Sequence, residues 1–175
     1  MNEKNDNRDR LEFISTIITN PKGNVLLLKR SKELKLDPNK YDMCSGHMKT
    51  GEAPMQTVYR EIKEELKIDL VDIQYVELLG TINTPHEKLE NTKTHIYNVG
   101  IDLSIEEINE RIRSILNGEI EEALYLENIN ELRKLQNNTS LFRTKYTEET
   151  ERMYQILEER VHSRKEKGKE ECEEK

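Results

Sequence analysis

The segment of residues 46–68 constrains this chain more than any other, and it reads GHMKTGEAPMQTVYREIKEELKI. Apolar side chains recur in it at the three- and four-residue spacing of one helical face: Met55, Val58, Tyr59, Ile62 and Leu66. Pro54 suits the first turn of a helix, where its missing N–H group is not needed. Gly46 and Gly51 would let the preceding loop fold back over the helix start. The segment therefore predicts an amphipathic helix that is entered through a glycine-containing loop.

A second face of this helix carries carboxylates. Glu61, Glu64 and Glu65 stand at positions i, i+3 and i+4, so their side chains share one face. Like charges at these spacings repel by a few tenths of a kcal/mol per pair, and a bound cation would reverse that interaction. Mg²⁺ prefers oxygen ligands and keeps several waters, and Mn²⁺ accepts the same ligands. We therefore predict that these three glutamates bind Mg²⁺ and that Mn²⁺ can replace it. The alternative is a solvated acidic surface.

The whole spacing resembles the Nudix box, G-x5-E-x7-R-E-U-x-E-E-x-G-U, where U is aliphatic. The matching residues are Gly46, Glu52, Arg60, Glu61, Ile62, Glu64, Glu65 and Ile68. The resemblance implies a pyrophosphohydrolase that cleaves a diphosphate linkage in a nucleoside diphosphate linked to another group X, or in a related organic diphosphate. It also implies that Arg60 orients and partly neutralises the glutamates. In this interpretation Glu52 braces the loop or helps to bind the metal.

An additional glutamate outside the box is implied by the same resemblance. Many family members place such a residue where it reaches back to the metal. Glu119, Glu121 and Glu122 precede Tyr125 in a segment that reads as a strand. We favour Glu122 as this catalytic residue. The alternative is that all three are solvated strand residues.

Lys67 stands where the box has its second glycine. A glycine there would end the helix in a left-handed conformation. Lysine in that conformation costs about 1 kcal/mol, or it moves the end of the helix by one residue. No carboxylate is lost by this replacement.

Two other functions are weighed against hydrolysis. The stretch around Cys44 and His47 resembles isopentenyl diphosphate isomerases, in which a cysteine just before Gly-His transfers protons and the histidine binds metal. Here Ser45 precedes Gly46, and a shift of one residue along a strand turns a side chain to the opposite face. We therefore interpret Cys44 as a small buried residue. A non-catalytic ligand-binding domain is the other alternative, although such proteins commonly lose the box carboxylates that this chain keeps.

The rest of the chain predicts one α/β domain. Strands are expected at residues 11–19, 25–29, 41–44, 73–82, 94–103 and 119–126, and helices after residue 54 and at residues 105–117, 128–135 and 148–161. This order fits the Nudix fold, a mixed β-sheet sandwiched between α-helices, over residues 11–161. The polar residues 1–10 predict a flexible tail, and the charged residues 162–175 predict a disordered one. We expect loops 30–40, 84–93 and 137–146 to decide which X is accepted.

Composition excludes several classes of protein. The two cysteines make a structural disulfide or a zinc cluster improbable, and a net charge of −7 argues against a nucleic-acid polymer as partner. The sequence shows neither a membrane-spanning apolar run nor an apolar signal region, so we expect a cytoplasmic protein. Its expected partner is a small-molecule diphosphate, and a homodimer is left open.

Overall fold

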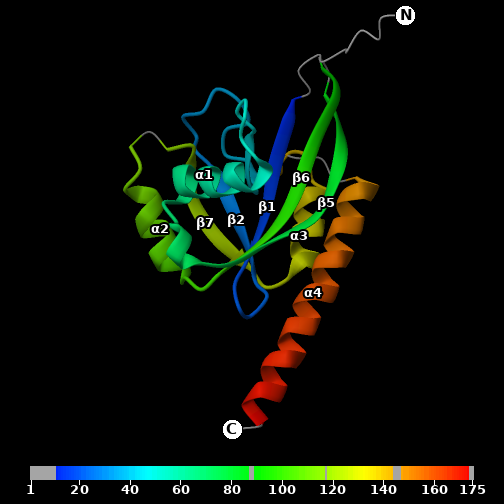
Figure 1. Ribbon diagram of the computed structural model, residues 1–175. Coiled ribbons are helices and arrows are strands. Elements are labelled where there is room, and N and C mark those ends of the chain that lie inside the picture. Colours follow the sequence, from blue (N-terminus) through cyan, green and yellow to red (C-terminus); the bar gives the residue numbers. More distant parts are fainter. Residues whose placement is uncertain (1–10, 87–88, 117, 144–146, 174–175) are drawn as a thin grey trace, which may run out of the picture.

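The computed structural model describes residues 11–86, 89–116, 118–143 and 147–173 (Figure 1). The predicted tail of residues 1–10 lies outside the described residues. The strands are β1 (Glu12–Thr19), β2 (Val25–Arg30), β3 (Tyr41–Asp42), β4 (Cys44–His47), β5 (Ile73–His86), β6 (Leu89–Ile101) and β7 (Ile120–Leu126). The helices are α1 (Pro54–Leu66), α2 (Ile105–Arg113), α3 (Ile129–Gln136) and α4 (Glu148–Glu173), with a short 3₁₀ helix, Leu70–Asp72, before β5.

The described strands form one mixed sheet. Its main order is β3-β2-β1-β6-β5, while β4 pairs with β1 and β7 pairs with β2. The central strands β1 and β6 run parallel, and the other pairs are antiparallel. Helices α1 and α2 pack on one face of the sheet and helices α3 and α4 on the other (Figure 1). This arrangement confirms the predicted mixed sheet between helices.

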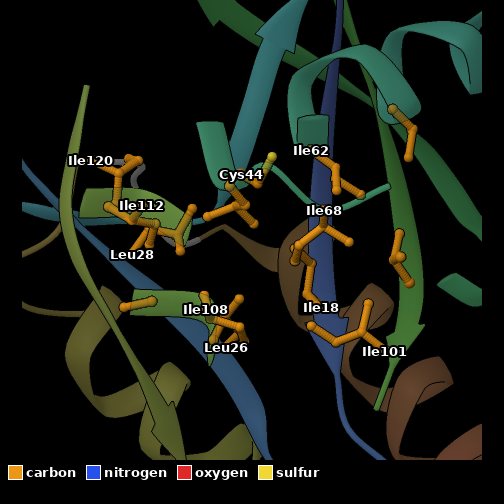
Figure 2. Close-up of a cluster of buried hydrophobic side chains, with 14 of the residues drawn as sticks. Ile18, Leu26, Leu28, Cys44, Ile62, Ile68, Ile101, Ile108, Ile112 and Ile120 are labelled. Carbon is orange, nitrogen blue, oxygen red and sulfur yellow. The ribbon is translucent and has the colours of Figure 1, made fainter. Parts of the chain in front are cut away.

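Two apolar cores result from these two faces. In β2, Leu26 and Leu28 point toward α1 and α2, whereas Val25 and Leu27 point toward α3 and α4. Both faces of this strand are buried, which explains why it reads as a continuous apolar run rather than an alternating one. Figure 2 shows the core on the α1 side, where residues from strands and helices meet around Ile68. This core fixes α1 against the sheet, and α1 carries the three glutamates at the spacing described above.

Helix α1 ends as a glycine-terminated helix would, although lysine occupies the position. Lys67 follows the last helical residue and has a left-handed backbone with φ of 51° and ψ of 33°. Its N–H donates to the carbonyl of Lys63 at 3.1 Å, and its Nζ donates to the carbonyl of Ser114 at 3.1 Å. The helix end is thus retained, and the lysine bears the left-handed conformation.

The end of the chain differs from the prediction. Helix α4 does not stop at Val161 but continues to Glu173, where we expected a disordered tail. One cause is Arg164, whose guanidinium lies 3.9 Å from the centre of the Tyr75 ring and donates to Glu77 Oε2 at 2.5 Å and to Asn98 Oδ1 at 3.0 Å. These contacts bind the distal part of α4 to β5 and β6. A charged composition alone could not reveal them.

Smaller differences concern element lengths. Helix α2 ends at Arg113 rather than at residue 117, because Ser114 and Ile115 donate to carbonyls three residues earlier and tighten the last turn. Strand β5 continues to His86 instead of ending at residue 82, and β6 begins at Leu89 and ends at Ile101 instead of spanning residues 94–103; the two pair with each other along their length. In the part of the chain that the structure describes, no helix has both the length and the apolarity needed to span a membrane.

The left-handed lysine yields a test of stability. Lys67→Gly should raise the free energy of unfolding by about 0.5–1 kcal/mol, because the relief of the left-handed strain exceeds the added chain entropy of glycine. Urea unfolding of the metal-free protein would measure it. Lys67→Ala is the matched control, since it removes the Nζ contact and keeps the strain. An alanine variant as stable as the glycine variant would contradict this account.

Candidate active site

Two glycines shape the loop before α1, each for a different reason. A Cβ atom on Gly46 would lie 1.9 Å from Oε1 of Glu61, so only glycine leaves room for that carboxylate against β4. Gly51 has a left-handed backbone with φ of 82° and open space around it, so its role is to form the turn. Gly46 is therefore required to leave room for Glu61 in the site, whereas Gly51 is required for the backbone conformation of the turn.

Arg60 lies at the centre of the site. Its guanidinium donates to both oxygens of Glu52, at 2.7 and 2.9 Å, in a bidentate pair. It also donates to Glu61 Oε1 at 2.5 Å, to Glu64 Oε2 at 3.2 Å and to the carbonyl of His47 at 2.9 Å. One arginine thus joins the loop to three carboxylates. This geometry is the one predicted for Arg60, which orients and neutralises the glutamates.

Glu52 braces the loop in this structure. Besides Arg60, its carboxylate accepts from the N–H of Lys49 at 3.0 Å and from the hydroxyl of Thr57 at 2.9 Å. The hydrogen bonds from Arg60, above all, hold the pKa of Glu52 well below its usual range. Both oxygens are engaged within the loop and helix. Of the two roles left open for Glu52, its contacts match the bracing one.

Glu61 and Glu64 differ in burial. The side chain of Glu61 is 12% exposed and that of Glu64 is 54% exposed. Burial raises the pKa of Glu61, although Arg60 opposes this effect. Glu64 is also 3.8 Å from the ammonium of Lys49. Arg60 therefore pairs with one buried carboxylate, that of Glu61, and with one solvated carboxylate, that of Glu64.

Glu65 is the exceptional member of the set. Its Oε2 atom is buried, and within the described residues it has no hydrogen-bond partner. Burial, together with the negative charges of Glu61, Asp42 and Glu119, raises the pKa of Glu65 to about 8. The neighbouring Cys44 thiol acts on this pKa in the opposite direction. A buried carboxyl oxygen without a hydrogen-bond partner lowers the stability of the folded protein, so its presence requires an explanation.

The three predicted metal ligands therefore lie on one face of α1, as their spacing requires. Among the described residues, however, no group of three or more His, Cys, Asp or Glu side chains is arranged as a metal-binding cluster. In this structure the guanidinium of Arg60 engages one oxygen of Glu61 and one oxygen of Glu64.

Glu122 does not lie where we predicted it. It pairs with Lys29 across β2 and β7, and the next pair, Leu27 with Leu124, packs toward α3 and α4. Strand alternation puts Glu122 on that same face, opposite to α1. Its carboxylate accepts from Lys29 Nζ at 3.3 Å, and that of Glu121 lies 3.8 Å from the same ammonium. This placement separates Glu122 from the acidic face of α1 and does not support the catalytic role predicted for it.

Glu119 and Asp42 are the acidic residues outside the box whose charges act on Glu65. Glu119 lies 3.7 Å from the buried guanidinium of Arg30, and Asp42 accepts from Arg143 at 3.2 Å. Counting alternate positions from Tyr125 leads through Ala123 and Glu121 to Glu119, although the register shift after Lys29 interrupts this alternation before Glu119. Asp42 could have been noticed as a charged residue in a strand next to the box.

Cys44 is buried, as predicted, with 1% of its surface exposed. It belongs to the apolar core on the α1 side of the sheet. The ring of His47 packs edge-on against Phe13, with 5.3 Å between the ring centres. His47 contributes its backbone carbonyl to Arg60. In these positions the Cys44 thiol and the His47 imidazole both pack against other residues of the protein.

A model of the NUDIX domain matches residues 10–144 of this chain. The chain belongs to the Nudix family. Its fold is similar to that of a pyrophosphohydrolase from Bacillus subtilis, with a TM-score of 0.62, 14% identity and 90% and 87% of the two chains covered. A comparison with curated proteins gave no match.

Two further solved structures share the Nudix fold of this chain. DR0079 from Deinococcus radiodurans gives a TM-score of 0.59 at 16% identity, with 87% of this chain and 88% of that chain covered. The MutT protein from Methanosarcina mazei Go1 gives 0.56 at 19% identity, with 86% and 95% covered. At these identities the similarity concerns the fold.

The buried carboxyl group predicts an unusual pH dependence of stability. The pKa of Glu65 rises from an ordinary value of 4.5 to about 8 in the folded protein. Between these values the unfolded chain has lost the proton and the folded one keeps it, so this group's contribution to stability falls as pH rises. Glu65→Gln removes the effect. The metal-free variant should gain roughly 1 kcal/mol or more over the parent near pH 8, and little near pH 4.

Chemical unfolding of both proteins with chelator present, across this pH range, measures the difference. Glu106→Gln, an exposed glutamate on α2, serves as the control and should leave the profile of the parent protein unchanged. A Glu65→Gln gain that is the same at every pH would contradict the assignment.

Proposed function

We propose that this Nudix protein is a divalent-metal-dependent pyrophosphohydrolase that cleaves a diphosphate linkage in a small organic substrate. A nucleoside diphosphate linked to another group X is the class we favour. The observation that carries the proposal is the unpartnered Oε2 of Glu65, buried on the helix face that also presents Glu61 and Glu64. The structural neighbour from Bacillus subtilis is a pyrophosphohydrolase, which supports the same reaction class.

The donor set fits a hard cation. Glu61, Glu64 and Glu65 offer carboxylate oxygens at helical spacing, which is the chemistry that Mg²⁺ and Mn²⁺ accept. A cation there would satisfy Oε2 of Glu65 and would lower the repulsion that Glu61, Asp42 and Glu119 exert on it. When bound, such an ion supplies charge neutralisation for diphosphate oxygens and polarises the phosphorus. We name Mg²⁺ as the ion, with Mn²⁺ as a substitute.

The residues of the chain supply positioning. Phosphoryl transfer asks mostly for orientation and charge neutralisation, and little covalent chemistry from the protein. Arg60 keeps Glu61 and Glu64 on one side of the helix and ties that side to the loop through Glu52. The absence of a side chain at Gly46 lets Glu61 lie against β4. The loop and the helix therefore hold the carboxylates as one unit.

The burial of Cys44 favours hydrolysis over isomerisation. An isomerase of the kind weighed above needs a thiol that reaches its substrate, whereas this thiol is enclosed by the core. Burial, together with Glu65, raises the pKa of Cys44 well above its ordinary value. A thiol held in its neutral form is poorly suited to proton abstraction.

Removal of the metal gives the first functional test. We expect that excess chelator abolishes turnover of organic diphosphates and that added Mg²⁺ or Mn²⁺ restores it, because three carboxylates on one face repel a diphosphate. Phosphate-ester release from a panel of nucleoside diphosphate conjugates measures the activity. Turnover that persists in chelator would overturn the metal requirement.

A substitution test addresses the ligands. Glu64→Gln should lower kcat by at least about 100-fold with the fold intact, since Glu64 is half exposed and contributes little to the core. Glu106→Gln is the matched control on an exposed helix face and should retain activity. Circular dichroism and thermal unfolding establish folding. Equal kcat in the two variants would argue that Glu64 lies outside the reaction site.

The nature of the products separates hydrolase from isomerase. The Cys44→Ala protein should still release a cleaved phosphate ester, such as a nucleoside monophosphate, when metal is saturating. Mass spectrometry of the products decides the matter. A folded Cys44→Ala protein without activity, together with parent protein that yields isomerised and uncleaved isoprenoid diphosphate, would replace the proposal by the isomerase.

A further inference from the structure

Strand β5 forms an edge of the sheet that is open along one side. In the described part of the chain β5 pairs with β6 alone, so the backbone groups of its other side have no partner strand. Proteins commonly protect such an edge with lysine, with proline or by keeping the strand short. β5 is 14 residues long, contains neither lysine nor arginine, and has its only proline at the penultimate position. This edge can therefore accept another strand.

A hollow of about 410 Å³ lies beside this edge, between β5 and α4. Leu78 and Leu79 both line it from the strand, because the register shift between Leu78 and Gly80 interrupts the alternation of side chains. Ile156 lines it from the helix. Leu78 is 52% exposed, so a partner that covers the hollow would bury apolar surface and gain free energy.

The helix side of the hollow carries two opposite charges. Ile156, Glu159, Arg160 and Ser163 stand at positions i, i+3, i+4 and i+7, which is one face of α4. Glu159 and Arg160 are both exposed. Arg160 lies 3.3 Å from Glu77 of β5, so this face of α4 is directed toward the edge of the sheet, along which α4 runs (Figure 1). A partner that presents the same two charges in the opposite order would complement it.

A second copy of the chain presents the charges in that order. A two-fold axis perpendicular to the sheet sets two identical edge strands antiparallel and keeps both α4 helices on the same face of the joined sheet. The two helices then also run antiparallel. Glu159 can therefore pair with Arg160 of the partner subunit, and Arg160 with Glu159 of the partner subunit.

We propose that this protein forms a symmetric dimer in which β5 pairs with the same strand of a second copy and the two α4 helices meet through Glu159 and Arg160. A second copy fits better than an unrelated protein, because the open edge, the apolar hollow and the charge pair are all self-complementary about one axis. The inference goes beyond the proposed function and does not rest on it, since α1 lies on the other face of the sheet from α4.

The mass of the full chain in solution tests the dimer. Light scattering after gel filtration should give twice the 20.7 kDa mass of one chain. Leu78→Lys should raise the dissociation constant at least about 10-fold, because it places a charge on the apolar edge. Leu116→Lys is the matched control, since this leucine is 93% exposed and follows α2 on the other face of the sheet. The control should dimerise as the parent does.

Two opposite charge reversals give a sharper test. Glu159→Arg makes both charges on this face of α4 positive, and Arg160→Glu makes both negative, so each variant alone should be monomeric. An equal mixture of the two variants should form a dimer, since each positive face then meets a negative one. Misfolding of either variant could not produce this recovery, and circular dichroism establishes that both are folded.

Three results would overturn the inference. A parent chain that stays monomeric would remove the dimer. A dimer that survives Leu78→Lys and both charge reversals would place the interface elsewhere on the molecule. Folded charge-reversed variants that remain monomeric after mixing would reject the pairing of Glu159 with Arg160. The proposed hydrolase activity is measured separately and stands or falls independently of all three.

Discussion

The site depends on the guanidinium of Arg60. Three glutamates converge on it, and without a positive charge their mutual repulsion would open the loop before α1. The carboxylates in turn raise the pKa of Arg60 still further, so its charge is permanent. Because the arginine also holds the carbonyl of His47, the same group ties helix, loop and strand β4 together. Preorganisation of the acidic face thus comes from a single side chain.

Glu65 is stabilised far less than its neighbours. Its carboxyl group is buried beside other negative charges, and Arg60 donates to Glu52, Glu61 and Glu64 instead. Such an arrangement opposes folding in the absence of a ligand, which is a common property of functional sites. In the proposed enzyme the ion would offset this cost, since a ligand that binds the folded chain alone stabilises it by mass action. Stability and metal affinity are therefore linked through one carboxyl group.

The sequence predicted the layers of the fold and the central ion-pair group well, because both depend on short-range spacing. Apolar periodicity placed α1, and the positions of Glu61, Glu64 and Glu65 on one helical face follow from helix geometry alone. The placement of Glu122 was not foreseen, because regular alternation from Leu124 puts it on the face of α3 and α4, opposite to α1. The prediction also missed the extent of α4, which depends on the long-range contacts of Arg164 with Tyr75 and Glu77.

The left-handed backbone of Lys67 shows that the second glycine of the box is needed for a backbone conformation and not for a chemical group. Lysine adopts this backbone conformation at a modest cost in free energy. The hydrogen bond from its Nζ to the carbonyl of Ser114 offsets part of that cost. A pattern search that requires glycine at this position would discard the chain, although every carboxylate of the box is in place. Relatives that have diverged in the same way would be found by weighting that position for backbone conformation, with lysine or asparagine admitted beside glycine.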